Sequence, residues 1–231
     1  MRNTFLFDLD GTLLPMNQDE FVELYFNGIE THFAGRYDTQ QLKKTVWAGT
    51  MEMVKNQGHK TNEEVFWDTA EALIDIDRES VREEFEEFYS TTFEVARQAA
   101  SARDDVVKFV RALRNKGYKI VAATNPLFPV VATRNRINWA GFTWDDFDLV
   151  TTYDMMHYSK PNVDFYNEIL QLIGKKPEEC VMVGNDNQED MCAETLGIEG
   201  YLITDHMINR DDAPITCKWH GTYDEFIKLQ F

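Results

Sequence analysis

An apolar run that ends in two carboxylates lies near the start of the chain and limits what it can fold into. Residues 4–7 read TFLF, which has the length and aromatic content of a buried strand, and Asp8 and Asp10 follow it. Gly11 then gives the backbone freedom for a sharp turn. Carboxylates at the end of a buried strand must be solvated, paired or bound to a cation. Because open α/β sheets bind ligands at the carboxyl ends of their strands, this stretch predicts an active site.

Composition and charge indicate a folded, acidic protein. The 231 residues are 43% hydrophobic and 13% aromatic, which is enough for one large domain or a main domain with a smaller insert. The net charge of -17 argues against nucleic acid or an anionic membrane as a partner. An anionic substrate would therefore need a metal ion, a lysine and backbone amides to reverse the field locally.

The sequence also bears on location and redox state. The N-terminal residues show no signal-peptide pattern, and no apolar run approaches the ~20 residues of a membrane span, so a cytoplasmic location is predicted. Cys180, Cys192 and Cys217 have no metal-ligand spacing, and their odd number does not suggest a disulfide framework. We expect reduced and mostly buried thiols.

A long stretch without a strand follows the first motif. Apolar residues recur at helical spacing from residue 16 to residue 99, and Thr61 with Glu64 has the pattern of a capping box. Such a stretch is too long for an ordinary crossover between parallel strands. The sequence therefore predicts an inserted helical domain over residues 16–99, and a main domain formed by residues 1–15 and 100–231. The predicted helices include 39–54, 61–73 and 79–93.

Helices and strands alternate in the rest of the chain, which is typical of an α/β fold with a parallel sheet. The predicted helices cover 104–115, 129–140, 163–173 and 223–231, and the predicted strands cover 118–123, 148–152, 201–204 and a segment that begins at residue 180. Arg134 and Arg136 on the second of these helices are expected at the surface. His157 and His206 are expected to be solvent or core residues, because neither has a partner at metal-ligand spacing.

Polar residues also follow the later strands. Thr124 and Asn125 come after the second strand, Lys160 precedes a proline, and the loop over residues 184–190 reads GNDNQED. Taken singly, these features would be a turn, a solvated lysine and a loop that caps a helix. The position of Thr124 at the end of an apolar strand favours a role in a site instead, and the loop over residues 184–190 also follows a short buried strand.

Residues 8–13, which read DLDGTL, resemble the first signature of the haloacid dehalogenase superfamily in its phosphatase-like branch. The resemblance implies that Asp8 attacks phosphorus, that Asp10 acts as general acid and base, and that Mg²⁺ bridges the carboxylate and the substrate. Thr124 matches the second motif, which binds the phosphoryl group, and Lys160 matches the third, whose ammonium stabilises charge. The predicted phosphate-binding residues are Asp8, Thr124, Asn125 and Lys160.

The loop over residues 184–190 resembles the fourth motif, which supplies the remaining metal-binding acids. In the commonest pattern an aspartate follows the glycine directly, but here Asn185 holds that position and Asp186 comes one residue later. Either side chain offers an oxygen acceptable to Mg²⁺. Asp186 is the preferred ligand and Asn185 the alternative, while Asp190 is expected just behind the direct ligands. The predicted metal ligands are therefore Asp8, Asp10 and Asp186.

The resemblance also implies an architecture. A three-layer, Rossmann-like parallel sheet with strand order 5-4-1-2-3 would carry the site, and an α-helical cap inserted after the first motif would close over it. Aromatic residues of the cap are then candidates for substrate contact, although helical aromatics more often form core. These candidates are Phe33, Tyr37, Trp47 and Trp67.

Taken together, the motifs predict a Mg²⁺-dependent hydrolase of a small phosphorylated metabolite, similar to a phosphoglycolate phosphatase, that works through an aspartyl-phosphate as a monomer or homodimer. A sugar-phosphate mutase of the same superfamily would keep all four motifs. A non-catalytic binding or regulatory module on this fold is a further alternative, because fold does not fix function. A phosphonate-cleaving member would need a buried cap lysine, and the sequence marks none of Lys43, Lys44, Lys55 and Lys60 as buried.

Overall fold

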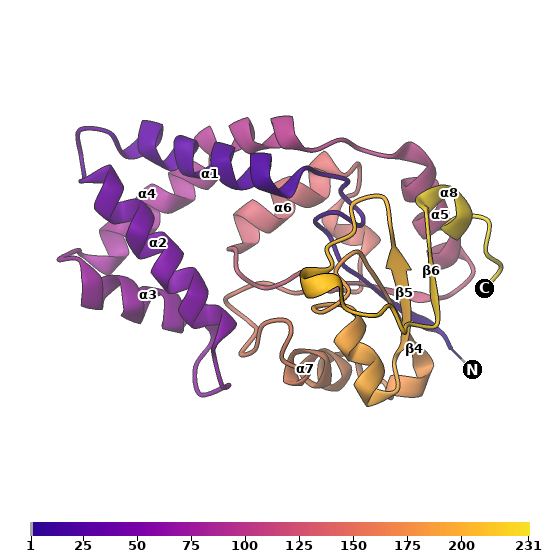
Figure 1. Cartoon of the computed structure of the whole chain (residues 1–231). Helices are drawn as coiled ribbons and strands as arrows, with labels where there is room; N and C mark the ends of the chain where they lie inside the picture. Colours follow the sequence, from indigo (N-terminus) through magenta and orange to yellow (C-terminus); the bar gives the residue numbers. More distant parts are fainter. Residues whose placement is uncertain (1) are drawn as a thin grey trace.

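A six-stranded parallel sheet forms the core of one end of the molecule, at the right in Figure 1. The computed structural model describes residues 2–231, and the strand order is β3-β2-β1-β4-β5-β6. The strands are β1 (Thr4–Phe7), β2 (Lys119–Ala122), β3 (Leu149–Val150), β4 (Cys180–Gly184), β5 (Glu199–Ile203) and β6 (Trp219–Gly221). The order predicted for the first five strands is confirmed. The sequence did not predict β6, which has only three residues and therefore shows no periodic pattern.

Helices cover both faces of this sheet, so the side chains of its strands are buried on both sides. Phe5 and Phe7 of β1 pack in the core with residues of α5 and α6, whereas Leu6 packs with residues of α7. The helices around the sheet are α5 (Asp104–Asn115), α6 (Val130–Trp139), α7 (Asp164–Ile173) and α8 (Tyr223–Phe226). The predicted α/β class with helices on both faces is confirmed.

The predicted helix over residues 223–231 is wrong in its length. Helix α8 ends at Phe226, and the chain beyond it carries Phe231 onto the ring of Phe5, with an edge-to-face distance of 4.9 Å between ring centroids. The apolar residues after Phe226 therefore cover the sheet without continuing the helix.

Between β1 and α5 the chain forms only helices, and we call residues 18–99 the helical segment. In Figure 1 its helices α2, α3 and α4 lie at the opposite end of the molecule from β4, β5 and β6. The capping box of Thr61 and Glu64 is present at the start of α3. The elements of the segment are α1 (Gln18–Phe33), α2 (Thr39–Val54), α3 (Asn62–Leu73), α4 (Arg78–Ser90) and a 3-10 helix, η1 (Thr92–Ala99).

The two connections of the helical segment lie side by side. Met16 and Ala100 form an antiparallel bridge. On either side of it, the amide of Asn17 donates to the carbonyl of Ala99, and the amide of Ser101 donates to the carbonyl of Pro15, each at 2.9 Å. The chain therefore leaves the sheet and returns to it through one short, hydrogen-bonded ladder.

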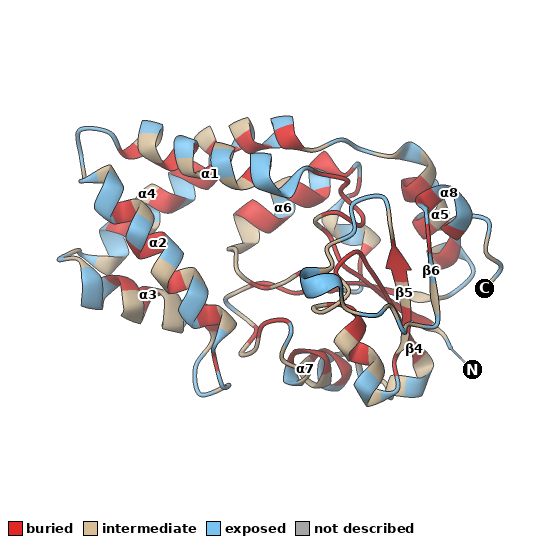
Figure 2. Ribbon diagram, in the orientation of Figure 1, coloured by how far each residue is buried: buried red, intermediate tan, exposed pale blue. Residues whose placement is uncertain are grey.

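Aromatic side chains form the core of the helical segment and join it to the sheet. Phe88 of α4 is fully buried, and its ring centroid lies 6.1 Å from those of Phe33 and Phe93. Phe128 comes from the loop after β2, yet its ring lies 5.6 Å from that of Tyr25 in α1. Figure 2 shows the buried faces of the helices turned inward. The segment and the sheet therefore share one continuous apolar core.

The structure also bears on what the sequence predicted about the cysteines and about membrane-spanning helices. All three cysteines are free, as predicted, but only Cys180 is buried, while Cys192 and Cys217 are partly exposed. The prediction of mostly buried thiols is therefore wrong for two of the three. Within residues 2–231, no helix combines the length and the apolar character needed to cross a membrane.

We expect Phe88→Ala to lower the free energy of unfolding by about 3–5 kcal/mol, because it removes a fully buried ring from a packed core and leaves a cavity. Urea unfolding monitored by circular dichroism measures the change. Leu73→Ala in the same segment is the control, since Leu73 is 50% exposed and its truncation should change stability by less than about 0.5 kcal/mol. Equal losses for the two variants would contradict this description of the core.

Candidate active site

Three neighbouring strands end at the same edge of the sheet, and their polar successors meet there. In the parallel register, Phe7 at the end of β1 lies beside Ala122 of β2 and Val183 of β4. Asp8 directly follows β1, and Thr124 comes two residues after β2. Short spacing after paired strands is therefore what places these side chains together, as the sequence predicted.

A buried lysine connects two of the carboxylates. Lys160 is 1% exposed, and its Nζ lies 2.7 Å from Oδ1 of Asp8 and 2.6 Å from Oδ1 of Asp190. The amide of Lys160 donates to Oδ1 of Asn125 at 3.1 Å, which fixes the lysine's backbone beside the end of β2. One ammonium group thus holds the side chains of Asp8 and Asp190, and the backbone amide of the same lysine holds Asn125.

Burial sets the protonation behaviour of this cluster. It raises the pKa of Asp8 to about 8, against the opposing effect of the Lys160 ammonium. Burial also raises the pKa of Asp190, and Lys160 again opposes the shift. For Lys160 itself burial acts to lower the pKa, but Asp190 and Asp8 outweigh it, so the pKa lies above its ordinary value. The lysine therefore stays charged, whereas Asp8 needs further positive charge to be fully ionised at neutral pH.

The second aspartate of the first motif pairs with an arginine that the sequence did not place in the site. Arg136 of α6 is 1% exposed, forms an ion pair with Oδ2 of Asp10 and stacks over the ring of Phe128 at 4.4 Å. The prediction that Arg136 lies at the surface is therefore wrong, whereas Arg134 is exposed as expected. The signal was present in the sequence, because Arg136 is four residues from Ala132 on the buried face of α6.

Asn185 is buried, and its side chain connects the first motif to the segment after β5 by hydrogen bonds. Its Oδ1 accepts a hydrogen bond from the hydroxyl of Thr12 at 2.9 Å, and its Nδ2 donates to the carbonyl of His206 at 2.7 Å. The amide lies close against Gly11, where a Cβ atom would come within 2.3 Å of Nδ2 and where φ is +85°. Glycine is therefore required at position 11 both by its backbone conformation and by this contact.

Asp186 faces the site, and it is paired with a second unpredicted arginine. The Nη1 of Arg210 lies 2.7 Å from Oδ2 and 3.0 Å from Oδ1 of Asp186, and its Nη2 lies 3.2 Å from Oε1 of Glu189. Arg210 is the first residue of a short 3-10 turn, η5 (Arg210–Asp212), between β5 and β6. No periodic pattern surrounds it, so no sequence signal assigns it to the site.

These side chains surround a cavity of about 230 Å³, which we call the polar cavity. It is lined by Asp8, Asp10, Gln18, Thr124, Asn125, Leu127, Phe128, Arg136, Lys160, Asp186, Glu189, Asp190, Ile208 and Arg210. All predicted site residues except Asn185 lie on this cavity. Between the two alternatives for the fourth motif, the geometry therefore favours Asp186 as the residue that can reach a bound group.

The chemistry of the polar cavity fits a divalent cation. Five acidic and three basic side chains line it, which leaves two negative charges when all are ionised. Oδ1 of Asp10 is buried without a hydrogen-bond partner, as a free ligand oxygen would be. Within residues 2–231, no three His, Cys, Asp or Glu side chains converge as a ready metal site, because the carboxylates are turned to Lys160, Arg136 and Arg210. A cation bound to Asp186 would have to displace Arg210.

The remaining candidates from the sequence lie away from the polar cavity. His157 bonds to Glu168 at 2.7 Å, and His206 is exposed and offers only its carbonyl to Asn185. None of the four lysines named for imine chemistry is buried, and none lines the cavity. The site therefore lacks the lysine that phosphonate cleavage would require.

The aromatic candidates of the helical segment divide into two groups. Phe33 is fully buried in the segment's core, and the hydroxyl of Tyr37 donates to Glu84 at 2.6 Å on the segment's own surface. Trp47 and Trp67 line a larger cavity that adjoins the site. Only these two of the four predicted candidates face a space that a ligand can enter.

The family of the chain follows from its sequence as a whole. A sequence model of the haloacid dehalogenase-like hydrolases matches residues 3–193, which include the first three motifs and the loop after β4. Because the match covers most of the chain, the protein belongs to this family of hydrolases. The resemblance seen in residues 8–13, and with it the prediction of a hydrolytic enzyme, is confirmed.

Individual relatives agree with this assignment. The pyrophosphatase PpaX of Bacillus cereus (strain AH820) is 27% identical over 198 residues, which span 84% of this chain and 80% of PpaX. Among solved structures, a HAD phosphatase from Thermococcus onnurineus is 21% identical with a TM-score of 0.62, and the match covers 99% of this chain and 97% of that one. CbbY from Rhodobacter sphaeroides, solved with xylulose-(1,5)bisphosphate, is 16% identical with a TM-score of 0.60 over 99% and 96% of the two chains. At these identities the structures support the fold alone.

The raised pKa of Asp8 predicts a stability effect in the metal-free protein. Between 3.8, the ordinary pKa of the carboxyl, and about 8, the native state holds a proton that the unfolded state releases, so the free energy of unfolding falls as pH rises. Asp8→Asn removes this loss. We expect the variant to be more stable than the wild type at pH 8 by at least about 1.4 kcal/mol, the equivalent of one pKa unit.

Urea unfolding in a chelator at pH 5 and pH 8 measures the effect, and the difference should shrink at the lower pH. Asp145→Asn is the matched control, because Asp145 is exposed and outside the cavity. A stability difference that grows toward pH 5 would contradict the assigned environment of Asp8.

Proposed function

We propose that this hydrolase cleaves phosphomonoesters with the help of Mg²⁺, and that the helical segment acts as a cap over the site. The observation that carries the proposal is the arrangement of Asp8, Asp10 and Lys160 on one cavity at the carboxyl edge of the sheet. Two carboxylates on one motif, one paired with a lysine and the other with an arginine, can take two different roles in one reaction.

In the first step an oxygen of Asp8 attacks the phosphorus of the substrate, and the bond between phosphorus and the leaving oxygen breaks. Asp10 donates a proton to that oxygen, so the product leaves as a neutral alcohol. Arg136 is a positioning residue in this step, because its ion pair holds Oδ2 of Asp10 and leaves Oδ1 without a hydrogen-bond partner. The phosphoryl group is then bonded to Asp8.

In the second step a water molecule attacks the phosphorus, Asp10 accepts its proton, and the bond from phosphorus to Asp8 breaks to release inorganic phosphate. The ammonium of Lys160, together with Thr124 and Asn125, stabilises charge on the transferring group. Lys160 also orients Asp8 through the 2.7 Å contact with Oδ1.

The family resemblance implies a divalent metal, and Asp8, Asp10 and Asp186 would hold it. The cation would supply positive charge that ionises Asp8 and draws an anionic phosphoryl group into an acidic protein. Asp190 is positioned to orient this arrangement from behind, since its Oδ2 accepts a hydrogen bond from the amide of Asp186 at 3.0 Å. Mg²⁺ suits a set of oxygen ligands of this kind.

We expect Asp8→Asn to lower kcat for p-nitrophenyl phosphate by at least about 10⁴-fold, because the variant lacks the nucleophile. The assay measures inorganic phosphate with sugar phosphates, nucleotides, phosphoglycolate and pyrophosphate as further substrates, with and without Mg²⁺. Released phosphate identifies hydrolysis, whereas a mutase would return an isomer of a sugar phosphate. Asp145→Asn should retain full activity. A rate that is unchanged both by chelation and by Asp8→Asn would contradict the proposal.

The choice between the two candidate metal ligands has a separate test. We expect Asp186→Asn to raise the Mg²⁺ concentration for half-maximal activity by at least about tenfold, since a charged carboxylate ligand is replaced by a neutral amide. Asn185→Ala should mainly lower the unfolding temperature, because it releases Thr12 and the carbonyl of His206. If Asn185→Ala shifts the Mg²⁺ requirement more than Asp186→Asn does, the assignment of Asp186 is wrong.

A further inference from the structure

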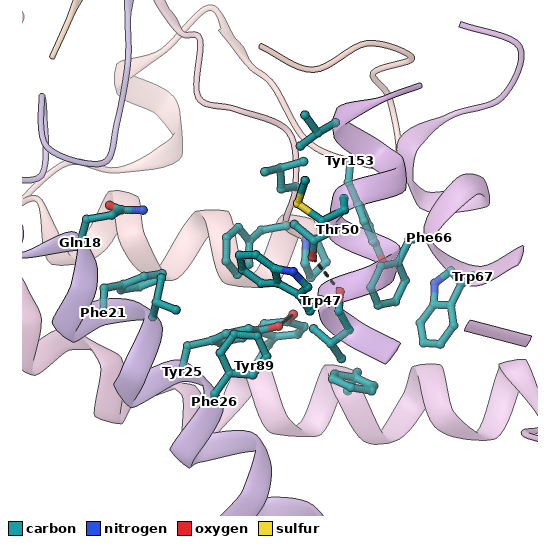
Figure 3. Close-up of a pocket in the computed structure, with 18 of the residues that line it drawn as sticks. Gln18, Phe21, Tyr25, Phe26, Trp47, Thr50, Phe66, Trp67, Tyr89 and Tyr153 are labelled. Atoms are coloured by element: carbon teal, nitrogen blue, oxygen red, sulfur yellow. Dashed lines mark hydrogen bonds between the residues drawn. The ribbon is translucent and has the colours of Figure 1, made fainter. Parts of the chain in front are cut away.

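A second, larger cavity opens directly from the polar cavity. It has a volume of about 530 Å³ and lies mainly within the helical segment; we call it the aromatic cavity (Figure 3). The two cavities share the lining residues Gln18, Leu127, Phe128, Glu189 and Arg210. A phosphoryl group beside Asp8 would therefore extend its ester group past these residues into the aromatic cavity. The volume of the aromatic cavity is typical of cavities that enclose a whole small molecule.

Aromatic side chains are the most numerous kind in the walls of the aromatic cavity. Of the 22 residues that line it, ten are Phe, Tyr or Trp, and only four are charged. In Figure 3, Gln18 and Phe21 lie at one end of the labelled group, and Phe66 and Trp67 lie at the other. Since Gln18 also lines the polar cavity, the aromatic surface extends away from the site of phosphoryl transfer.

Most polar groups in these walls already have partners within the protein, while Nε1 of Trp67 is buried without one. The hydroxyls of Tyr25 and Tyr89 bond to each other at 2.9 Å, and the hydroxyl of Thr50 donates to the carbonyl of Val46 at 2.9 Å. Of the charged residues, Arg82 pairs with Glu63 at 2.8 Å. Glu189 and Arg210 pair with each other at 3.2 Å where the two cavities meet.

These pairings decide which leaving groups the cavity favours. A sugar, a glycolate or a second phosphate must give up its hydrogen bonds to water on entry, and largely apolar walls with a single buried unpaired donor, Nε1 of Trp67, offer little in exchange. An apolar group loses only its contact with water and gains contact with the rings. The same walls therefore select for apolar groups and against polar ones.

We propose that the physiological substrate is the phosphomonoester of an apolar alcohol large enough to fill the aromatic cavity. This inference rests on the proposed phosphatase activity and narrows it. It also departs from the sequence-based expectation of a substrate similar to phosphoglycolate. The helical segment then selects the substrate by the apolar character of the alcohol, while the polar cavity recognises the phosphoryl group that all candidate substrates share.

The test compares kcat/KM for three phosphate esters in Mg²⁺: 2-(1-naphthyl)ethyl phosphate, octyl phosphate and glycerol 3-phosphate. Each leaves as a primary alcohol, so differences in chemical reactivity are small and binding of the alcohol dominates. We expect at least one apolar ester to exceed glycerol 3-phosphate by about tenfold or more. The order of the two apolar esters then tells whether the cavity takes a planar ring or a flexible chain.

A substitution in the wall of the aromatic cavity tests whether this cavity causes the preference for apolar esters. Trp47 lines the cavity but is 55% exposed, so Trp47→Ala is expected to fold. The variant should lower the ratio of kcat/KM for the preferred apolar ester over glycerol 3-phosphate by about fivefold or more, mainly through KM. Leu73→Ala, an exposed residue of the helical segment outside the cavity, should leave the ratio unchanged.

The outcomes separate this inference from the proposed function. Turnover of glycerol 3-phosphate as efficient as that of both apolar esters, or a preference that Trp47→Ala leaves intact, would overturn the inference and leave the phosphatase proposal standing. No Mg²⁺-dependent turnover of any ester would overturn the phosphatase proposal, and the inference with it.

Discussion

The contact between the Lys160 ammonium and two carboxylates is the interaction on which the site depends. A lysine that is 1% exposed has lost most of its hydration. Contacts with negative charges must compensate for this loss. Asp8 comes from the end of β1 and Asp190 from the loop after β4, so the ion triad joins three segments that are far apart in the sequence. In a protein with a net charge of -17, this cation provides positive potential at the point proposed for phosphoryl binding.

Those parts of the site that follow buried strands could be predicted from the sequence, and the parts that depend on distant contacts could not. Asp8 and Thr124 follow apolar runs, and the parallel register brings them to one edge. Arg136 is recognisable only by its place on the buried face of α6, and its partner Asp10 lies 126 residues away. Arg210 has no local pattern, because its position depends on how the segment after β5 crosses the loop that contains Asp186.

The helical segment shows a different limit of sequence reasoning. Aromatic residues at helical spacing line its core and its cavity alike, so the sequence cannot distinguish Phe33, which is fully buried in the core, from Trp47, which faces the cavity. The distinction arises from how four helices and Phe128 pack together, and each contributes only part of the wall. The specificity proposed for this cavity is therefore a property of the assembled segment, whereas the residues proposed for the chemistry lie on the short loops of the sheet.

The hydrogen-bonded ladder between Pro15 and Ser101 limits how far the helical segment can disturb the sheet from which it extends. Because the amide of Ser101 lies 2.9 Å from the carbonyl of Pro15, the two ends of the segment meet almost where a short loop would have joined β1 to α5. The closure entropy of a long excursion grows only slowly with its length. Evolution can therefore lengthen, shorten or replace everything beyond this ladder while the order of the strands and the edge of the sheet stay unchanged. The ladder would make the helical segment, proposed here to select the substrate, an exchangeable module on a constant sheet.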